Sequence, residues 1–224
     1  HALYEQGVDE RLARTSLCGG ASLGIHESQS RLWENYVGRG AYFWNYFYSI
    51  LALNRPQSSA LAATFLKKKE EDFILAVNAV KPNLIRVDSD ELTYNLHIIL
   101  RFEIEKDLFA GRLKVADLPE AWNAKIKEYL GLTVPDDAHG VLQDIHWSCG
   151  SFGYFPTYSL GNLNAAQIYA AAKRDLGDLE EQIKRGQLGF LREWLRNKIH
   201  RHGQTYPAKG LIKKVTGEPL NPVY

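Results

Sequence analysis

The sequence contains no methionine and only two cysteines, Cys18 and Cys149, among its 224 residues. Two cysteines so far apart have neither metal-type spacing nor the density of a disulfide framework, so we expect buried free thiols and a cytoplasmic, reducing setting. Because position 1 is not methionine, we expect a processed chain or a piece of a longer one. No apolar run is long enough for a signal peptide or a membrane span, which predicts no membrane partner.

An excess of charge is also missing, since 27 basic and 26 acidic side chains give a net charge of +1. This balance predicts no nucleic-acid partner and no attraction to an anionic membrane, so any binding specificity must be local. With 45% hydrophobic and 24% charged residues, the chain is long enough to bury a sizeable core. No internal repeat or low-complexity linker interrupts it, and we expect a single domain over residues 1–224.

Apolar residues recur mostly at spacings of three and four, which predicts a mainly α fold with little or no β structure. Asp117 and Glu120 have the spacing of a capping box at a helix start. The segment 135–160 has no sustained period and is rich in glycine, proline and aromatic residues, so we expect a loop there. The expected helices are approximately 1–7, 25–37, 42–53, 58–79, 90–110, 117–131, 164–176, 178–185, 188–200 and 207–215.

The first group of residues with possible chemistry is the tetrapeptide His26-Glu27-Ser28-Gln29, which follows His1 on the next expected helix. A catalytic zinc needs three protein ligands and an open position, and helical zinc peptidases take histidines from one helix and a glutamate from a neighbour. His1 and Glu27 could be two such ligands. Taken alone, however, a terminal histidine and a helical glutamate more often have no metal role.

A second group forms a polar stripe with a spacing of four on one expected helix. Two interpretations are open: a surface stripe of ion pairs, or a buried hydrogen-bonded network that fixes helices around a site. From spacing alone we favour the surface stripe. The polar stripe consists of Thr93, His97, Arg101 and Glu105, and the apolar stripe beside it of Leu92, Leu96, Ile99 and Phe102.

The third group lies in the irregular segment and includes His146, Tyr154 and Tyr158. Histidine and tyrosine donors there could serve a hydrolase by stabilising a developing oxyanion. The alternative is an aromatic loop that is merely packed, and without further signals we favour packing.

Together these segments resemble the carboxypeptidase Taq family of metallopeptidases. Its signatures are H-E-x-x-H, H-E-S/G-Q, R-x-x-A-D-x-x-T-x-x-x-H-I-x-x-R-x-x-x-E and G-x-x-Q-D-x-H-W. The last three occur here in the family's order, at 26–29, 86–105 and 140–147, with Ser89 where the family usually has alanine. The resemblance covers nearly the whole chain. It implies the C-terminal part of a helical, saddle-shaped gluzincin-type metallopeptidase.

The resemblance implies that His1 is the second histidine of H-E-x-x-H and that Glu27 is the third metal ligand. It places His26, Gln29 and His97 in supporting positions around the site. The metal implied is zinc, with cobalt or manganese as alternatives. Zinc would lower the pKa of a bound water to about 7 for attack on the last peptide bond.

A carboxypeptidase must also hold the free carboxylate of its peptide substrate, for which an arginine fork is suited. Arg86 is the first candidate and Arg101 the second, although either could be a structural ion pair. His146, with Tyr154 or Tyr158, would be the catalytic donors to the scissile carbonyl. The residues alone do not decide between the two tyrosines.

The expected activity is therefore metal-dependent removal of C-terminal residues from peptides. Because the first histidine and the glutamate of H-E-x-x-H would precede His1, we expect this chain to have an incomplete site and to be inactive by itself. The family implies a homodimer for the full-length protein. The alternatives are a non-catalytic helical peptide-binding or scaffold protein and, less favoured, another helical gluzincin such as an oligopeptidase.

Overall fold

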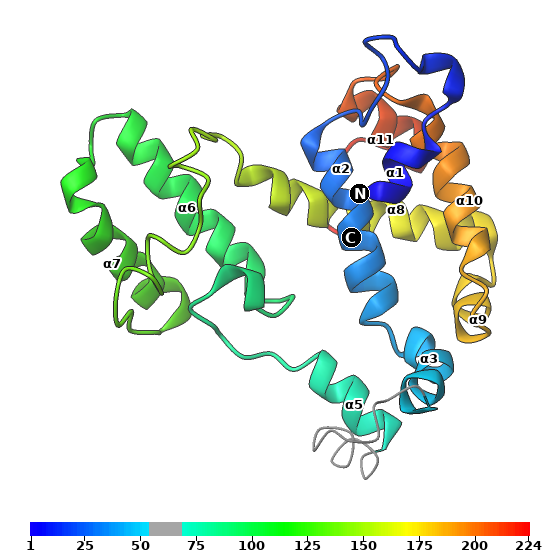
Figure 1. Ribbon diagram of the computed structural model, residues 1–224, viewed down its shortest axis with the longest axis horizontal. Helices are drawn as coiled ribbons and strands as arrows, with labels where there is room; N and C mark the ends of the chain where they lie inside the picture. The colour runs from blue at the N-terminus through cyan, green and yellow to red at the C-terminus, as the bar shows by residue number, and fades with distance from the viewer. Residues whose placement is uncertain (54–68) are drawn as a thin grey trace. The chain divides into compact units, whose positions relative to one another are not determined.

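The computed structural model describes residues 1–53 and 69–224, and within these ranges every regular element is a helix. This confirms the prediction of a mainly α fold. Figure 1 shows the helices and their connections. The α-helices are α1 (Ala2–Gly7), α2 (Leu23–Arg31), α3 (Ala41–Leu53), α5 (Glu70–Val77), α6 (Tyr94–Phe109), α7 (Leu118–Leu130), α8 (Pro156–Leu176), α9 (Leu179–Lys184), α10 (Gly189–Lys198) and α11 (Ala208–Thr216).

Shorter or unusual helices connect these elements. A π-helix, η2 (Leu32–Gly38), continues α2 without a break. The 3-10 helices are η1 (Glu10–Leu12), η3 (Arg86–Asp88), η4 (Val115–Asp117) and η5 (His200–His202).

Most expected helices agree with the structure, and the differences have local causes. Helix α8 begins at Pro156 rather than near Asn164, because proline is well suited to the first turn of a helix. Asp117 precedes α7 but its side chain makes no capping hydrogen bond, so the capping box is wrong. Of the helix expected over 58–79, the structure contains α5, and the segment before residue 69 lies outside the described residues.

The packing divides the chain into two compact units. Unit 1 comprises residues 1–77 and 160–224, and unit 2 comprises residues 78–159. Helix α8 contributes its first residues to unit 2 and the rest to unit 1. That residues 1–224 form a single domain stays a prediction.

Unit 1 has its core around the part of α8 that belongs to it, with α1, α2, α10 and α11 gathered nearby (Figure 1). Small buried side chains on α8, including Ala165 and Ala172, allow neighbouring helices to come close. The large buried side chains of this core include Tyr4, Ile25, Leu32, Ile168, Leu179, Leu191, Leu195 and Ile199.

Unit 2 is built on the pair α6 and α7, whose core consists of Leu100, Ile104, Trp122, Ile126 and Leu130. A smaller cluster of Tyr94, Ile98 and Phe155 joins α6 to the segment before α8. Gly131 ends α7 in the left-handed conformation, with φ of 70°, as glycine after a helix permits.

The polar stripe of α6 is buried, so the surface-stripe interpretation is wrong. Exposure is 0% for both His97 and Arg101, whereas Leu92 in the apolar stripe is 71% exposed and Phe102 44%. The helix thus turns its charged side inward, against the irregular segment that follows α7. The alternative interpretation, a buried hydrogen-bonded network, is the one that the structure contains.

The prediction of buried cysteines is also wrong, because Cys18 and Cys149 are both free and exposed. Both lie in irregular segments and not on the inner face of a helix, where a small apolar side chain would be covered. Among the helices in the described ranges, none combines the length and the apolar character that crossing a bilayer requires.

Candidate metal centre and buried arginine network

The two predicted metal ligands lie together in unit 1. His1 immediately precedes α1, and Glu27 lies in α2, whose start is capped by the Ser22 hydroxyl accepting from the Ile25 amide at 3.1 Å. His1 Nε2 is 3.3 Å from Glu27 Oε2. The histidine side chain is half exposed, whereas the glutamate side chain is mostly buried.

This separation fits two ligands of one metal ion. Tetrahedral zinc ligands at bond lengths of 2.0–2.2 Å lie about 3.4 Å from one another. Imidazole and carboxylate are both donors that zinc accepts. Within the part of the chain that the structure describes, no group of three histidine, cysteine, aspartate or glutamate side chains could hold a metal. His1 and Glu27 therefore fit as part of a ligand set, and the described residues supply only these two.

His26 contacts the other nitrogen of the His1 ring, since the two Nδ1 atoms form a short hydrogen bond. His26 Nε2 lies 2.8 Å from Glu5 Oε1. A carboxylate only accepts, so a neutral His26 donates from Nε2 and accepts at Nδ1 from His1. In that tautomer the lone pair of His1 Nε2 faces Glu27 Oε2, as a metal-binding nitrogen requires.

Gln29 does not touch the two candidate ligands. Its amide donates to Ser28 Oγ at 3.0 Å, and its oxygen accepts from His200 Nε2 at 2.8 Å, with both Gln29 and His200 buried. Burial lowers the pKa of His200 to about 4, so that its ring is neutral at pH 7. Gln29 therefore supports the site indirectly, by tying α2 to η5.

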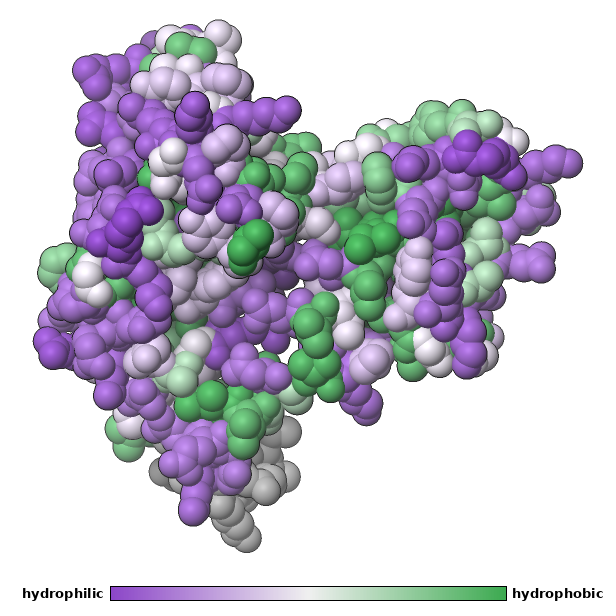
Figure 2. Space-filling view, turned by 180° about the vertical axis from the view of Figure 1, so that it is seen from behind, coloured by the Kyte–Doolittle hydropathy of each residue, from purple (hydrophilic) through white to green (hydrophobic). Residues whose placement is uncertain are grey.

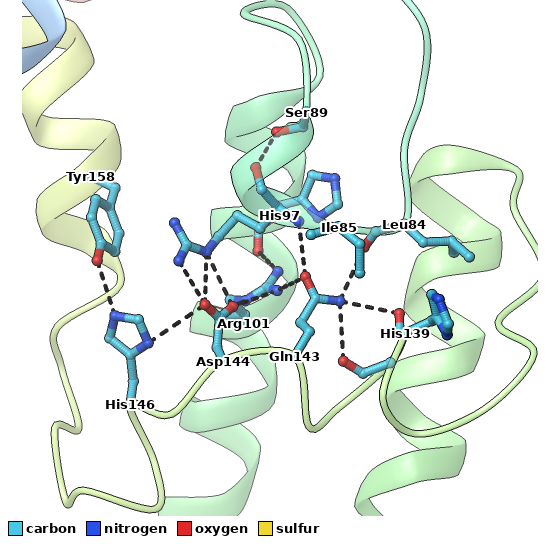
Figure 3. A network of polar contacts seen from close by, with 12 residues as sticks. Leu84, Ile85, Ser89, His97, Arg101, His139, Gln143, Asp144, His146 and Tyr158 are labelled. Carbon is cyan, nitrogen blue, oxygen red and sulfur yellow. Dashed lines mark hydrogen bonds and ion pairs between the residues drawn. The ribbon is translucent and has the colours of Figure 1, made fainter.

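In unit 2, one carboxylate binds both arginines that the sequence marked as candidates for substrate binding. Asp144 accepts from Arg86 Nη2 at 2.6 Å and from Arg101 Nε at 2.8 Å (Figure 3). Arg101 Nη1 also donates to the His97 carbonyl at 2.8 Å, and Arg86 Nη1 donates to the Tyr94 hydroxyl at 3.1 Å. These contacts join η3, α6 and the segment after α7.

The charges of this cluster are partly compensated, because one carboxylate faces two guanidinium groups. Burial alone would raise the pKa of Asp144, but the hydrogen bond from Arg86 and the charges of both arginines outweigh burial, and the net pKa lies below its ordinary value. Burial lowers the pKa of Arg101 to about 10, which leaves the guanidinium charged at pH 7. The Arg101 side chain has no exposed surface. For Arg101 the geometry therefore favours the structural ion pair over contact with a substrate, and Arg86 keeps only a small exposed fraction.

Gln143 completes the network next to Asp144. Its side-chain oxygen accepts from the Arg86 amide and from Arg101 Nη2, both at 2.9 Å. Its amide nitrogen donates to the carbonyls of Leu84 and Gly140 at 3.0 and 3.1 Å. Figure 3 shows Gln143 and Asp144 side by side on the loop, facing Arg101.

The predicted catalytic donors lie at one end of this network. His146 Nε2 is 3.0 Å from the Tyr158 hydroxyl, and His146 Nδ1 is 3.7 Å from Asp144 Oδ1. Tyr154 packs its ring beside His146, with centroids 5.3 Å apart. Burial lowers the pKa of His146 below its ordinary value. The three side chains therefore form one group, in which the Tyr158 hydroxyl is hydrogen-bonded to His146.

His97 is fully buried and lies one helical turn before Arg101 in α6. Burial, followed by the charge of Arg101, lowers the pKa of His97 to about 4. A neutral ring beside two guanidinium groups avoids a third buried positive charge.

Sequence reasoning assigned no role to Asp144, Gln143, Arg31 or Glu5. The signal for the first two was present, because buried arginines require a carboxylate partner and Gln143-Asp144 is part of a quoted motif. Arg31 follows Glu27 by four positions on the expected helix 25–37, so the sequence already indicated a helical ion pair there. Glu5 is identified only by its contact with His26 in the structure.

Three comparisons with known proteins give one consistent result. A family model described as carboxypeptidase Taq (M32) metallopeptidase matches residues 1–224. Carboxypeptidase 1 of Bacillus subtilis is 46% identical over the whole chain, and thermostable carboxypeptidase 1 of Thermus thermophilus is 48% identical over 97% of it. The chain spans 44% and 41% of the length of these two relatives.

Solved structures resemble the chain to the same extent. A Pyrococcus furiosus carboxypeptidase structure superposes with a TM-score of 0.93 at 45% identity, covering all of this chain and 44% of that one. Trypanosoma cruzi metallocarboxypeptidase 1 gives a TM-score of 0.87 at 39% identity, covering 99% of this chain and 45% of that one.

Proposed function

Since the chain belongs to the carboxypeptidase Taq (M32) metallopeptidase family, we propose that the protein containing it is a metal-dependent carboxypeptidase that removes C-terminal residues from peptides. The observation that carries the proposal is the convergence of His1 Nε2 and Glu27 Oε2. Because the chain spans less than half of its relatives, this activity belongs to the whole protein and not to these residues alone.

His1 and Glu27 would hold the metal, and His26 with Glu5 would keep the His1 ring in the tautomer that leaves Nε2 free. When bound, zinc would activate water and polarise the peptide carbonyl. We propose zinc, whose usual donors include imidazole and carboxylate, with cobalt or manganese as alternatives. A supporting partner on the second ring nitrogen is a usual feature of metal-bound histidines.

The network of unit 2 would serve the peptide. Arg86 is our candidate for binding the C-terminal carboxylate, which it would share with Asp144, while Arg101 would hold Asp144 in place. His146, Tyr154 and Tyr158 would donate to the developing oxyanion. Loss of one such donor commonly raises the barrier by about 3 kcal/mol. The Tyr158 hydroxyl contacts His146, and this favours the pair acting together.

We further propose that the protein works in the cytoplasm as a homodimer. Two exposed free cysteines are compatible with a reducing compartment. The homodimer rests on family resemblance alone, and sedimentation of the complete protein would test it.

The proposal is tested with the product of the complete open reading frame that encodes this chain. We expect it to bind one zinc ion and to trim peptide C-termini, and Glu27→Ala to lose both properties. The 224-residue chain by itself should neither retain stoichiometric zinc nor hydrolyse peptides, since affinity depends on the number of ligands. Peptide binding without cleavage by the complete product would instead support a helical peptide-binding or scaffold protein.

A further inference from the structure

We propose that Arg31 is a positioning residue that fixes the Glu27 carboxylate so that only one of its oxygens faces the metal. This inference rests on the proposed function, because it takes Glu27 as a metal ligand. It concerns an arginine that belongs to none of the groups identified from the sequence.

The contact between Arg31 and Glu27 is specific to one oxygen. Arg31 Nε lies 3.1 Å from Glu27 Oε1, whereas the other oxygen, Oε2, is the one 3.3 Å from His1. Both side chains are largely buried, at 13% and 14% exposure. A partly buried charge-assisted hydrogen bond is stronger than a surface pair and holds the carboxylate plane in one orientation.

Arg31 is itself held by a series of alternating charges along the same helix. Its Nη1 lies 3.1 Å from Glu34 Oε2, and Arg39 Nη2 lies 3.6 Å from Glu34 Oε1. Arg39 Nη1 in turn donates to the Val77 carbonyl at the end of α5, at 3.1 Å. In the wider turn of the π-helix η2, residues five apart lie next to each other, and this brings Glu34 and Arg39 together. Such π-helical turns are frequent at functional sites.

Helix α8 packs directly against Glu27. A Cβ atom on Gly161 would lie 2.5 Å from Glu27 Cγ and 2.8 Å from its Cβ. The stem of the glutamate side chain therefore lies directly against the α8 backbone, which limits the room in which it can move. With Oε1 bonded to Arg31, the carboxylate presents Oε2 to His1, where the metal would bind.

Without the arginine, both oxygens would be free to approach the metal and the side chain would be more mobile. Replacing a residue that orients a metal ligand typically weakens metal binding 10–100-fold. The consequence concerns affinity and coordination number, and both can be measured without an activity assay.

The test uses the complete open-reading-frame product with Arg31→Gln, Arg31→Lys and Glu27→Gln. Arg112→Gln is the matched control, since Arg112 forms an exposed ion pair with Asp107 in unit 2. The dissociation constant for Zn²⁺ is measured by competition with a chelator. The visible absorption of the cobalt-substituted protein reports coordination number, because its intensity falls when a further ligand joins a tetrahedral site.

We expect Arg31→Gln to raise the Zn²⁺ dissociation constant at least tenfold and to lower the cobalt absorption, Arg31→Lys to lie between it and wild type, and Arg112→Gln to stay within twofold. A Zn²⁺ constant for Arg31→Gln within twofold of wild type would overturn the inference, even if thermal stability fell. If Arg31→Gln does not fold, Arg31→Lys decides by the same twofold limit. Equal Zn²⁺ binding by Glu27→Gln and wild type would instead refute the proposed metal ligand itself.

Discussion

At the scale of single residues, Asp144 organises more of unit 2 than any residue singled out from the sequence. It accepts from Arg86 in η3 and from Arg101 in α6 and lies near His146 in its own loop, so one carboxylate ties two helices to this loop. Two guanidinium groups in a buried setting are tolerated only because this carboxylate and the Gln143 oxygen offset them. Removing the charge of Asp144 should therefore lower the stability of the fold.

We predict that Asp144→Asn lowers the free energy of unfolding by about 3–5 kcal/mol, since it leaves buried arginine charges uncompensated. Urea denaturation followed by tryptophan fluorescence, to which Trp122 and Trp147 of unit 2 contribute, measures this change. Asp107→Asn, which breaks an exposed pair with Arg112, should cost at most about 1 kcal/mol. Equal effects of the two substitutions would contradict the role given to Asp144.

We predict that His97 makes the chain less stable in mild acid. Burial holds its folded-state pKa at about 4, below the unfolded value of about 6.5. The unfolded state therefore binds more protons between these values. The stability that depends on a neutral His97 ring is fully present above pH 6.5 and is lost as the pH falls towards 4. The free energy of unfolding falls by about 3 kcal/mol in total through this group.

Denaturation at pH 7 and pH 5 checks this prediction for wild type and His97→Gln. The variant should lose less stability between the two pH values, and the remaining dependence should include His200, which has a similarly lowered pKa. His139→Gln, at an exposed position, should behave as wild type. An unchanged pH dependence in His97→Gln would refute the assignment.

At the scale of elements, the close approach of α2 and α8 places Glu27. This contact depends on Gly161, because the glutamate side chain occupies the space where a Cβ atom would lie. The π-helix η2, which continues α2, contains Glu34, and Glu34 pairs with Arg31 three positions before it. The position of one candidate ligand thus follows from the packing of two helices.

We predict that Gly161→Ala lowers the free energy of unfolding by about 1–3 kcal/mol, because overpacking forces the two helices apart. Thermal unfolding by circular dichroism measures the effect. Gly189→Ala is the control, since a Cβ atom there would meet nothing within 4 Å. It should be neutral or stabilising by up to about 1 kcal/mol. Destabilisation of the same size at both glycines would count against the proposed packing constraint.

At the scale of the whole molecule, unit 2 exposes an apolar face along α6. Its members recur at helical spacing, from Leu92 just before α6 to Phe109 at its end. Figure 2 shows that hydrophobic areas lie among hydrophilic ones on the visible surface. A face of this kind favours contact with another protein surface. The residues of the face are Leu92, Ile99, Phe102 and Phe109.

We predict that the 224-residue chain self-associates and that Phe102→Glu reduces the association, because a charge in the apolar face must be desolvated on contact. Sedimentation velocity over a range of concentrations measures it. Val223→Glu, at an exposed apolar position outside this face, should associate as wild type does. A monomeric wild-type chain at all concentrations would refute the prediction.

The sequence by itself determined the helical class, most helix positions, the family and the pairing of His1 with Glu27 as candidates. These depend on local periodicity and on motifs whose residues lie close in the chain. Only the tertiary structure decided which face of α6 is buried, that Asp144 is the partner of Arg86 and Arg101, and that both cysteines are exposed. The physical reason is that a spacing of four places side chains on one face of a helix but does not say what covers that face. The partners of the two buried arginines are 43 and 58 positions away along the chain, and folding alone brings them together.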